Sequence, residues 1–342
     1  MASVMLFADA GPGIGLGHLH RSLALAAALR HHVPCVVATL DDAGIRDRVR
    51  AAGCLFAPQP VFSAEATAHE VGDTVALARE YECRTIVVDS YAAAAGFLAG
   101  LRASGLRVVV LDDLAREPMP VQVVVNGGAQ APALPYVSST GDTVFLLGPA
   151  YAMLQPAFWD LPPRRIAGDV RHVLVTVGGD DTRNVTADLL GCLDRTSGDF
   201  DVRAVVGPFS SAGRRVDEAA RDSRRVVSVV RGVTSLRDLI AEADVAISAA
   251  GQTLYELAAA GTPTIAFELF DNQADNLEAL AAAGVVRSAG RVSDPGFHDR
   301  LAVLIDSLIL DAGARAGLSA AGQRLVDGRG AARVAAAVVA LR

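Results

Sequence analysis

The sequence predicts an α/β protein made of two Rossmann-like halves that face each other across a cleft. Short runs rich in valine and isoleucine alternate with helical patterns, and this alternation restarts after a proline-rich stretch in the middle of the chain. A chain of 342 residues is long enough for two domains of ordinary size. We expect domains at 1–157 and 169–342, with the last helix a candidate for crossing back to the first domain.

Composition and charge narrow the classes of function. Hydrophobic residues make up 51% of the chain, charged residues 20%, and the net charge of −7 disfavours a general nucleic-acid binder. No apolar run reaches the ~18–20 residues that span a bilayer, and the N-terminus has no signal-peptide pattern. The four cysteines lack metal-ligand spacing. We therefore expect a cytoplasmic protein without a nucleic-acid partner and without stable membrane insertion.

In the first half, strands and helices are expected to alternate. The expected strands are 4–7, 34–40, 85–89, 107–111 and 122–126, and the expected helices are 22–29, 43–52, 72–81 and 93–103. Near-continuous apolar strands separated by helices are typical of a parallel sheet that is buried on both faces.

A glycine-rich stretch, DAGPGIGLGHLHR at 9–21, joins the first strand to the first helix. Glycines such as Gly15 and Gly17 let the backbone turn tightly and approach a ligand closely. The helix that follows offers free N–H groups, which suit a phosphate or a developing anion. No frame of the stretch completes the G-x-G-x-x-G/A fingerprint, so a plain Rossmann dehydrogenase is disfavoured.

His18 lies at the junction of this loop and the helix. Imidazole is the side chain that changes protonation between about pH 5 and 8, so it suits a general base at neutral pH. At helical spacing Arg21 shares the face of His18, whereas His20 is turned away.

Polar residues follow several of the expected strands. They are Asp9, Asp89 with Ser90 and Tyr91, Asp112 with Asp113, and Asn126. In parallel sheets ligands bind outside the carboxyl ends of the strands. Each residue alone also fits a helix cap or a turn, so their shared edge is what favours a site.

The second half repeats the pattern. Its expected strands are 170–177, 201–206, 224–230, 245–248 and 264–268, and its expected helices are 184–193, 235–242, 254–260, 276–283 and an interrupted stretch at 319–341. One glycine turn contains Gly178 and Gly179, and a second contains Gly251, Gln252 and Thr253. Each turn precedes a helix and would offer backbone donors to a diphosphate.

Three further polar residues of this half are candidates for ligand contacts. Glu256 lies one turn inside a helix, where its carboxylate would accept both hydroxyls of a ribose; a glutamate there is equally favoured by the helix dipole. Asn272 and Gln273 would bind sugar hydroxyls or phosphate, and they are also ordinary turn residues. The absence of a His/Asp/Glu cluster with metal spacing points to chemistry without a metal ion.

Motifs spread over nearly the whole chain carry a resemblance to a known family. They are Asp9-Ala10, IGLGHLHRSLALA (14–26), VVDSY (87–91), LDDLA (111–115), LLGPAYAML (146–154), VTVGGDDTRNVT (175–186), ISAAGQTLYELAAAGTPT (247–264) and DNQADN (271–276). In these motifs the chain resembles the UDP-sugar hydrolases of pseudaminic acid biosynthesis, the UDP-2,4-diacetamido-2,4,6-trideoxy-β-L-altropyranose hydrolases. Those enzymes are similar in fold to two-domain (GT-B) glycosyltransferases.

The resemblance implies a GT-B architecture and hydrolysis of a UDP-linked amino-deoxy sugar at the anomeric carbon, without a metal or cofactor. It makes His18 the base that activates water and places Tyr91 on the sugar side. Glu256 and the backbone of Val233 also resemble the ribose and uracil contacts of the lipid-linked N-acetylglucosaminyltransferase of peptidoglycan synthesis. The family usually has histidine at the position of Ser90, so the identity of the sugar stays open.

Three hypotheses therefore stand side by side. The first is a nucleotide-sugar hydrolase, with UDP as the expected nucleotide. The second is a glycosyltransferase that uses the same donor site and an organic acceptor, and the third is a non-catalytic nucleotide-sugar binder. Chemistry at the anomeric carbon is nearly shared by the first two, and fold alone does not separate them. The oligomeric state is equally open.

Overall fold

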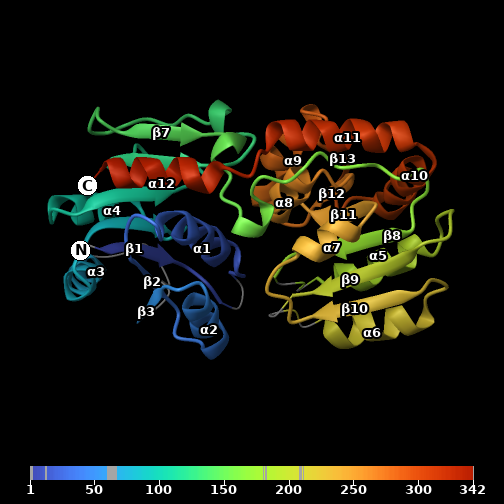
Figure 1. The fold of residues 1–342 in the computed structure, drawn as a ribbon, viewed down its shortest axis with the longest axis horizontal. Helices are drawn as coiled ribbons and strands as arrows, with labels where there is room; N and C mark the ends of the chain where they lie inside the picture. Colours follow the sequence, from blue (N-terminus) through green and yellow to red (C-terminus); the bar gives the residue numbers. More distant parts are fainter. Residues whose placement is uncertain are drawn as a thin grey trace. The chain divides into compact units, whose positions relative to one another are not determined.

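The computed structural model describes residues 3–11, 14–59, 68–179, 181, 183–207, 210 and 212–341. The chain divides into two compact units (Figure 1). The first unit comprises Met1–Trp159 and Arg329–Arg342, and the second comprises Asp160–Gly328. Each unit is an α/β structure around one parallel sheet, which confirms the predicted fold class. The expected cleft stays a prediction.

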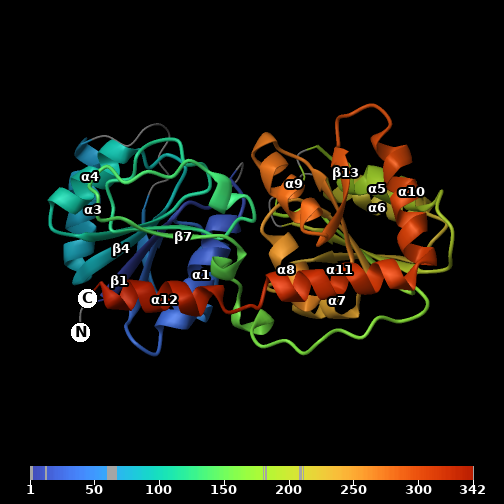
Figure 2. The same cartoon turned by 90° about the horizontal axis from the view of Figure 1, so that it is seen from above.

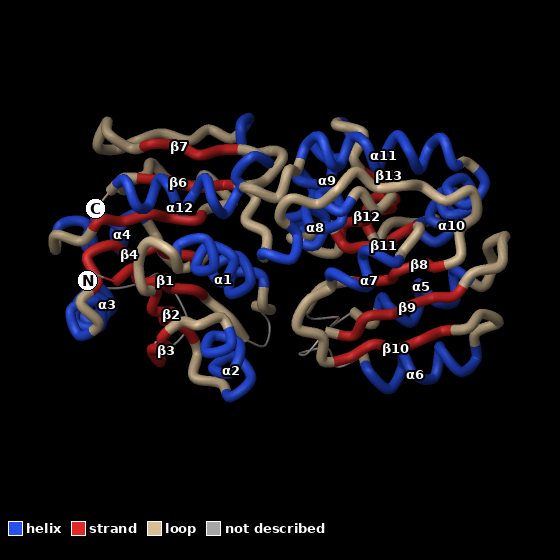
Figure 3. Tube along the Cα trace, viewed as in Figure 1, coloured by secondary structure: helices blue, strands red, loops and turns tan. Residues whose placement is uncertain are grey.

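The first unit has a seven-stranded parallel sheet in the order β3-β2-β1-β4-β5-β6-β7 (Figure 3). The strands are β1 (Ser3–Ala8), β2 (Cys35–Thr39), β3 (Leu55–Pro58), β4 (Cys83–Asp89), β5 (Arg107–Leu111), β6 (Val123–Asn126) and β7 (Val144–Leu147). The helices are α1 (Gly17–Leu29), α2 (Ala43–Ala51), α3 (Ala68–Glu80), α4 (Ala95–Ala103) and α12 (Gly330–Ala340). Short 3-10 turns lie at Ala131–Ala133, Pro149–Tyr151 and Pro156–Phe158.

Strand β1 lies at the point where the strand order of this sheet reverses. It pairs with β2 on one side and with β4 on the other, in a register that sets Ala8 beside Asp89. Met5 and Leu6 are completely buried, as expected for a strand covered on both faces. Helix α12 returns from the end of the chain to lie beside α1 (Figure 2). Ligands of open α/β sheets bind at such a reversal.

The second unit has a six-stranded parallel sheet in the order β10-β9-β8-β11-β12-β13. The strands are β8 (His172–Thr176), β9 (Asp201–Val206), β10 (Val227–Arg231), β11 (Val245–Ala249), β12 (Thr264–Glu268) and β13 (Val286–Arg291). The helices are α5 (Val185–Leu193), α6 (Gly213–Asp222), α7 (Arg237–Glu242), α8 (Thr253–Ala260), α9 (Ala274–Ala282), α10 (Phe297–Leu310) and α11 (Ala312–Leu325), with a 3-10 turn at Asp271–Gln273. Here the order reverses between β8 and β11.

Five of these elements were not predicted from the sequence: β3, β7, β13, α6 and α10. The three strands all lie at or next to a sheet edge and are short or interrupted by glycine or proline. Strand β7 begins before the proline-rich stretch at 146–168, which is interpreted from the sequence as the interdomain connection, and ends inside it. Among the described helices, none is both long and apolar enough to cross a membrane.

Candidate active site at the reversal of the first sheet

The loop after β1 closes on itself through its backbone. Gly15 donates its N–H to the carbonyl oxygen of Gly11 at 2.8 Å, and Gly11 donates back at 3.1 Å. Both glycines have positive φ, +139° for Gly11 and +84° for Gly15, a conformation that other residues rarely adopt. Helix α1 begins at Gly17, and within the described residues no group accepts its first N–H groups, so these donors are available to a ligand. Gly13 lies outside the described residues.

His18, at the start of α1, is held by a buried carboxylate. Its Nδ1 lies 2.6 Å from Oδ1 of Asp89, the last residue of β4, whose side chain is fully buried. Burial alone would raise the pKa of Asp89, but the charges and hydrogen bonds of Arg21 and His18 outweigh it and lower the pKa. An ionised carboxylate only accepts, so His18 carries a hydrogen on Nδ1; in the neutral imidazole, Nε2 is then the nitrogen with a lone pair.

Arg21 joins two carboxylates from neighbouring strands. It donates to Asp89 through Nε at 2.6 Å and through a terminal nitrogen at 2.5 Å. Its other terminal nitrogen lies 2.9 Å from both oxygens of Asp113, which follows β5. Burial would lower the pKa of Arg21, but the two carboxylates raise it. Arg21, predicted as a substrate ligand, is therefore engaged by Asp89 and Asp113.

Tyr91 completes this cluster from the loop after β4. Its hydroxyl donates to Asp113 at 2.9 Å, and its ring meets His18 edge-on with centroids 4.7 Å apart. Tyr91 is 45% exposed, so it forms the outer side of the cluster. The structure thus brings together the predicted residues His18, Arg21 and Tyr91.

Asp9 lies behind the same cluster. It is buried, and its backbone N–H donates to the carbonyl oxygen of Asp89. Burial raises the pKa of Asp9, and a hydrogen bond with Ser90 opposes this shift. His20, as expected, points elsewhere: it lies near Arg48, and burial and that charge lower its pKa to about 4.

The remaining strand-end residues have a structural role. Asp112 accepts the backbone N–H groups of Leu114 and Ala115 and the hydroxyl of Tyr136. Asn126 accepts the N–H of Gly128. These contacts shape the turns after β5 and β6. At this edge of the sheet, the side chains around His18 therefore form the candidate site, whereas Asp112 and Asn126 stabilise the turns.

In the second unit the predicted residues follow the carboxyl ends of four strands. Val233 follows β10, Gly178 and Gly179 follow β8, Gly251 to Thr253 follow β11, and Asn272 and Gln273 follow β12. They therefore share one edge of the sheet, although the contacts among the described residues do not join them all into a cluster.

The two glycine turns of this unit differ in the donors that they leave open. Asp181 accepts the N–H groups of Val185 and Thr186 at 2.8 and 3.0 Å, so the start of α5 is already capped. These two helix-start donors are therefore engaged, and diphosphate binding by the backbone of Gly178 and Gly179 stays a prediction.

No side chain caps α8, which begins at Thr253. Leu254 and Tyr255 already donate to the carbonyl oxygens of Gly251 and Gln252 at 3.1 Å. Among the first three N–H groups of α8, that of Thr253 is therefore the one without a partner in the described residues.

Glu256 lies one turn inside α8 and is partly buried. Burial raises the pKa of its carboxyl to about 8. Within the described residues no hydrogen bond or ion pair reaches this carboxylate. Hydroxyl groups of a ligand would supply the missing donors.

Asn272 and Gln273 have different surroundings. Gln273 accepts the N–H of Leu269 at 2.9 Å and so shapes the turn after β12, while its amide nitrogen faces Gly251. Asn272 is exposed. Of these two residues, Gln273 is the one directed toward the turn after β11, through its amide nitrogen.

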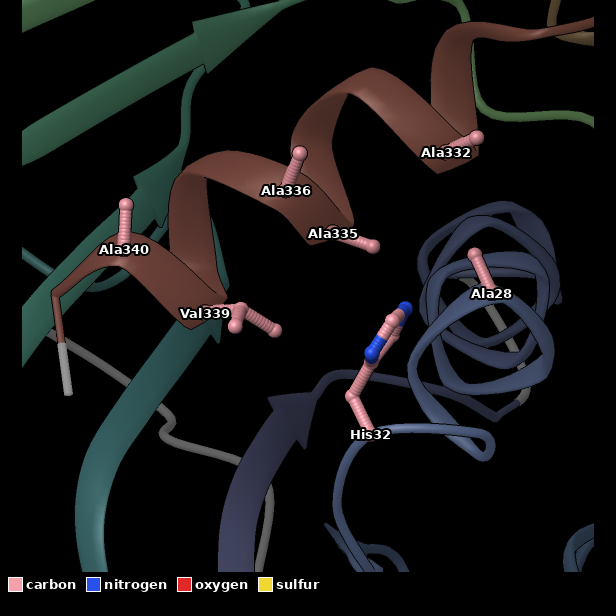
Figure 4. A pocket seen from close by; sticks show the side chains of 7 residues that line it. All are labelled: Ala28, His32, Ala332, Ala335, Ala336, Val339 and Ala340. Atoms are coloured by element: carbon pink, nitrogen blue, oxygen red, sulfur yellow. The ribbon is translucent and has the colours of Figure 1, made fainter.

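A separate groove of about 340 Å³ lies between α1 and α12 (Figure 4). Its lining is apolar except for His32, and Ala28 marks its position on α1. Ala28 and His18 are about 15 Å apart along the helix at 1.5 Å per residue. The groove contains none of the predicted site residues. The described residues also include no group of three or more potential metal ligands.

Comparisons with known proteins support the fold. No family model matches the chain. The chain is 25% identical to the spore coat polysaccharide biosynthesis protein SpsG of Bacillus subtilis over 348 residues, which cover 97% of this chain and 96% of SpsG. It is 20% identical to the uncharacterised protein MJ1062 of Methanocaldococcus jannaschii over 79% of this chain, and it spans only 56% of that protein.

Solved structures of glycosyltransferases share the whole fold. MurG of Acinetobacter baumannii matches with a TM-score of 0.71 and 14% identity over 99% of both chains. The calicheamicin glycosyltransferase CalG4 matches with a TM-score of 0.61 and 16% identity, over 99% of this chain and 98% of CalG4. The chain thus has a GT-B-like fold and is a distant homologue of SpsG.

Proposed function

We propose that this protein hydrolyses a UDP-linked amino-deoxy sugar at its anomeric carbon. The observation that carries the proposal is the His18–Asp89 pair at the reversal of the first sheet. Asp89 holds the hydrogen of His18 on Nδ1, so Nε2 is a base directed away from the carboxylate. No metal ion or cofactor enters the proposal.

In the proposed reaction His18 Nε2 removes a proton from water as the water oxygen bonds to the anomeric carbon. The bond from that carbon to the diphosphate oxygen breaks, and UDP leaves with the electron pair. The uncapped start of α1 offers N–H groups to the charge that develops on the leaving diphosphate. The products are UDP and the free sugar.

The nucleotide half of the proposal is supported by the second unit. Glu256 has a carboxylate without a partner in the described residues, and the N–H of Thr253, at the start of α8 one turn before it, likewise has none there. The carboxylate of Glu256 suits ribose hydroxyls, and the start of α8 suits a diphosphate. SpsG is named for polysaccharide biosynthesis, a process that uses activated sugars, and this agrees with a nucleotide-sugar substrate.

Transfer to an organic acceptor is the second candidate, favoured by the glycosyltransferases that share the fold. The same imidazole would then remove a proton from an acceptor hydroxyl. A binder without turnover is the third candidate, but a buried Asp–His pair is an unusual feature for it.

The deciding experiment is UDP release from a panel of UDP-sugars, without and with candidate acceptors, by wild type and His18→Ala. Release without an acceptor that requires His18 supports the hydrolase. Release only after an acceptor is added indicates a transferase, and tight binding with no release indicates a binder.

A further inference from the structure

Within the described residues, the hydrogen bonds that the side chains of the first cluster donate go to other members of the cluster. The terminal nitrogen of Arg21 that donates to Asp89 also lies 3.2 Å from His18 Nδ1, inside the cluster. Arg21 directs Nε and both terminal nitrogens at Asp89 and Asp113, and its side chain is only 13% exposed. His18 directs its Nδ1 hydrogen at Asp89. The cluster therefore presents acceptors to its surroundings.

The hydroxyl hydrogen of Tyr91 is also directed at a member of the cluster. Asp113 is ion-paired with Arg21 and only accepts, so the 2.9 Å contact requires Tyr91 to donate its single hydroxyl hydrogen. The Tyr91 oxygen then has only lone pairs for a ligand. Asp113 is 25% exposed, and within the part of the chain that the structure describes its Oδ1 accepts from Arg21 alone, so it keeps acceptor capacity as well.

We infer that the sugar side of the site is an acceptor wall, formed by His18 Nε2, the Tyr91 hydroxyl oxygen and the Asp113 carboxylate. This inference rests on the proposed function and specifies its substrate class. The wall binds a sugar through O–H or N–H donors, as in a neutral, amino or acylamino sugar. A sugar with a carboxylate facing this wall would meet a like charge and lone pairs without a hydrogen between them.

Arg21 is a positioning residue in this arrangement. It fixes Asp113, and Asp113 sets the direction of the Tyr91 hydrogen bond. Asp113→Asn would reverse that direction, because an amide donates to the Tyr91 oxygen and frees the phenolic hydrogen to point outward. One side-chain atom thus decides whether Tyr91 accepts from or donates to the sugar.

The test compares binding of UDP-glucose and UDP-glucuronic acid, which differ at C6 only, with UDP as the reference. Calorimetry on the full chain in a His18→Ala background avoids turnover and tests the two members of the wall that remain, Tyr91 and Asp113. We expect at least tenfold tighter binding of UDP-glucose than of UDP-glucuronic acid. Adding Asp113→Asn should reduce this ratio to below about threefold without changing the Kd of UDP, and Asp113→Glu should restore it.

Asp142→Asn is the matched control, because Asp142 also pairs with an arginine of the first unit, Arg102, outside the cluster. Tyr91→Phe is a second variant that keeps the ring beside His18 and removes the acceptor oxygen. It should weaken UDP-glucose but not UDP. Equal binding of the two sugars, or a ratio unchanged by Asp113→Asn, overturns the acceptor wall. Failure to bind UDP at all overturns the proposed function instead.

Discussion

The two units contain polar clusters that differ in how completely they are satisfied. In the first unit His18, Arg21 and Tyr91 are joined by Asp89 and Asp113 through contacts of 2.5 to 2.9 Å. In the second unit no described residue donates to the carboxylate of Glu256, and no side chain caps α8. One cluster is complete without a ligand, and the other is not.

This difference indicates a division of labour. A network whose members fix one another holds a base in one tautomer and one orientation, which is what chemistry at a single atom requires. A set of unsatisfied groups is costly in the free protein and gains its hydrogen bonds on binding. We therefore expect the first cluster to control turnover and the second to control affinity.

Removal of the base should have the largest effect. We expect His18→Ala and Asp89→Asn each to lower kcat by about 10³-fold or more, because the first removes the imidazole and the second no longer fixes its tautomer. UDP affinity, measured by calorimetry, should stay within about twofold. His31→Ala, at an exposed histidine beyond α1, is the control. A parallel loss of UDP affinity would contradict the division of labour.

Loss of the central arginine should affect stability before it affects binding. Arg21→Gln leaves the buried Asp89 with the imidazole of His18 as its remaining partner among the described residues, and removing one member of a buried pair costs about 3–5 kcal/mol. Chemical denaturation should detect this loss. Arg102→Gln, which breaks the exposed pair with Asp142, should change stability little. Similar stabilities of the two variants would show that the first cluster is not a mutually dependent network.

The sequence predicts most of the scaffold because its buried strands are nearly continuous apolar runs. The predicted ranges of β5, β9 and β12 coincide with the observed strands. Strands β3 and β7 were not predicted because each has only four residues and lies at a sheet edge. Edge strands are less completely buried, so their sequences show a weaker apolar pattern. Helix α10 had a readable signal, since Phe297, Leu301, Ile305 and Leu308 recur at helical spacing on its buried face.

The site was predicted in part. His18 and Arg21 share a helix face, a relation that spacing alone supplies. The partner of both, Asp89, lies 71 residues from His18 and was noted only as one of several strand ends. Its role depends on β4 lying next to β1, a strand order that local patterns do not determine. Asp113 was missed as a site residue for the same reason.

A smaller effect is expected in the second unit. At pH 9, where its carboxylate is ionised, Glu256→Ala should weaken UDP binding by about 1.5–3 kcal/mol, the range for a hydrogen bond to a charged group. kcat at saturating substrate should change little, because the first cluster is untouched. Glu268→Ala is the control, since Glu268 ends β12 and already pairs with Arg291. Unchanged UDP affinity would remove Glu256 from the nucleotide site.

The smallest effect is a pH dependence that belongs to Glu256 alone. With its pKa raised to about 8, the carboxyl is mostly protonated at pH 7 and mostly ionised at pH 9. Two ribose hydroxyls require the ionised form as acceptor, so UDP affinity should rise with pH, by up to about tenfold over this interval. The terminal phosphate of UDP resembles a phosphate monoester, which ionises near pH 6. We begin the titration at pH 7 so that this ionisation does not contribute to the change in affinity.

Stability should change with the opposite sign. Between the unfolded pKa near 4.5 and the folded pKa near 8, the folded protein retains a proton that the unfolded chain releases, so this group makes stability fall as pH rises. Glu256→Gln should remove both trends together. If Glu256→Gln removes the pH dependence of stability but keeps the pH dependence of UDP affinity, another residue accepts the ribose hydroxyls. Glu256 would then not be the unsatisfied group with which the first cluster is compared.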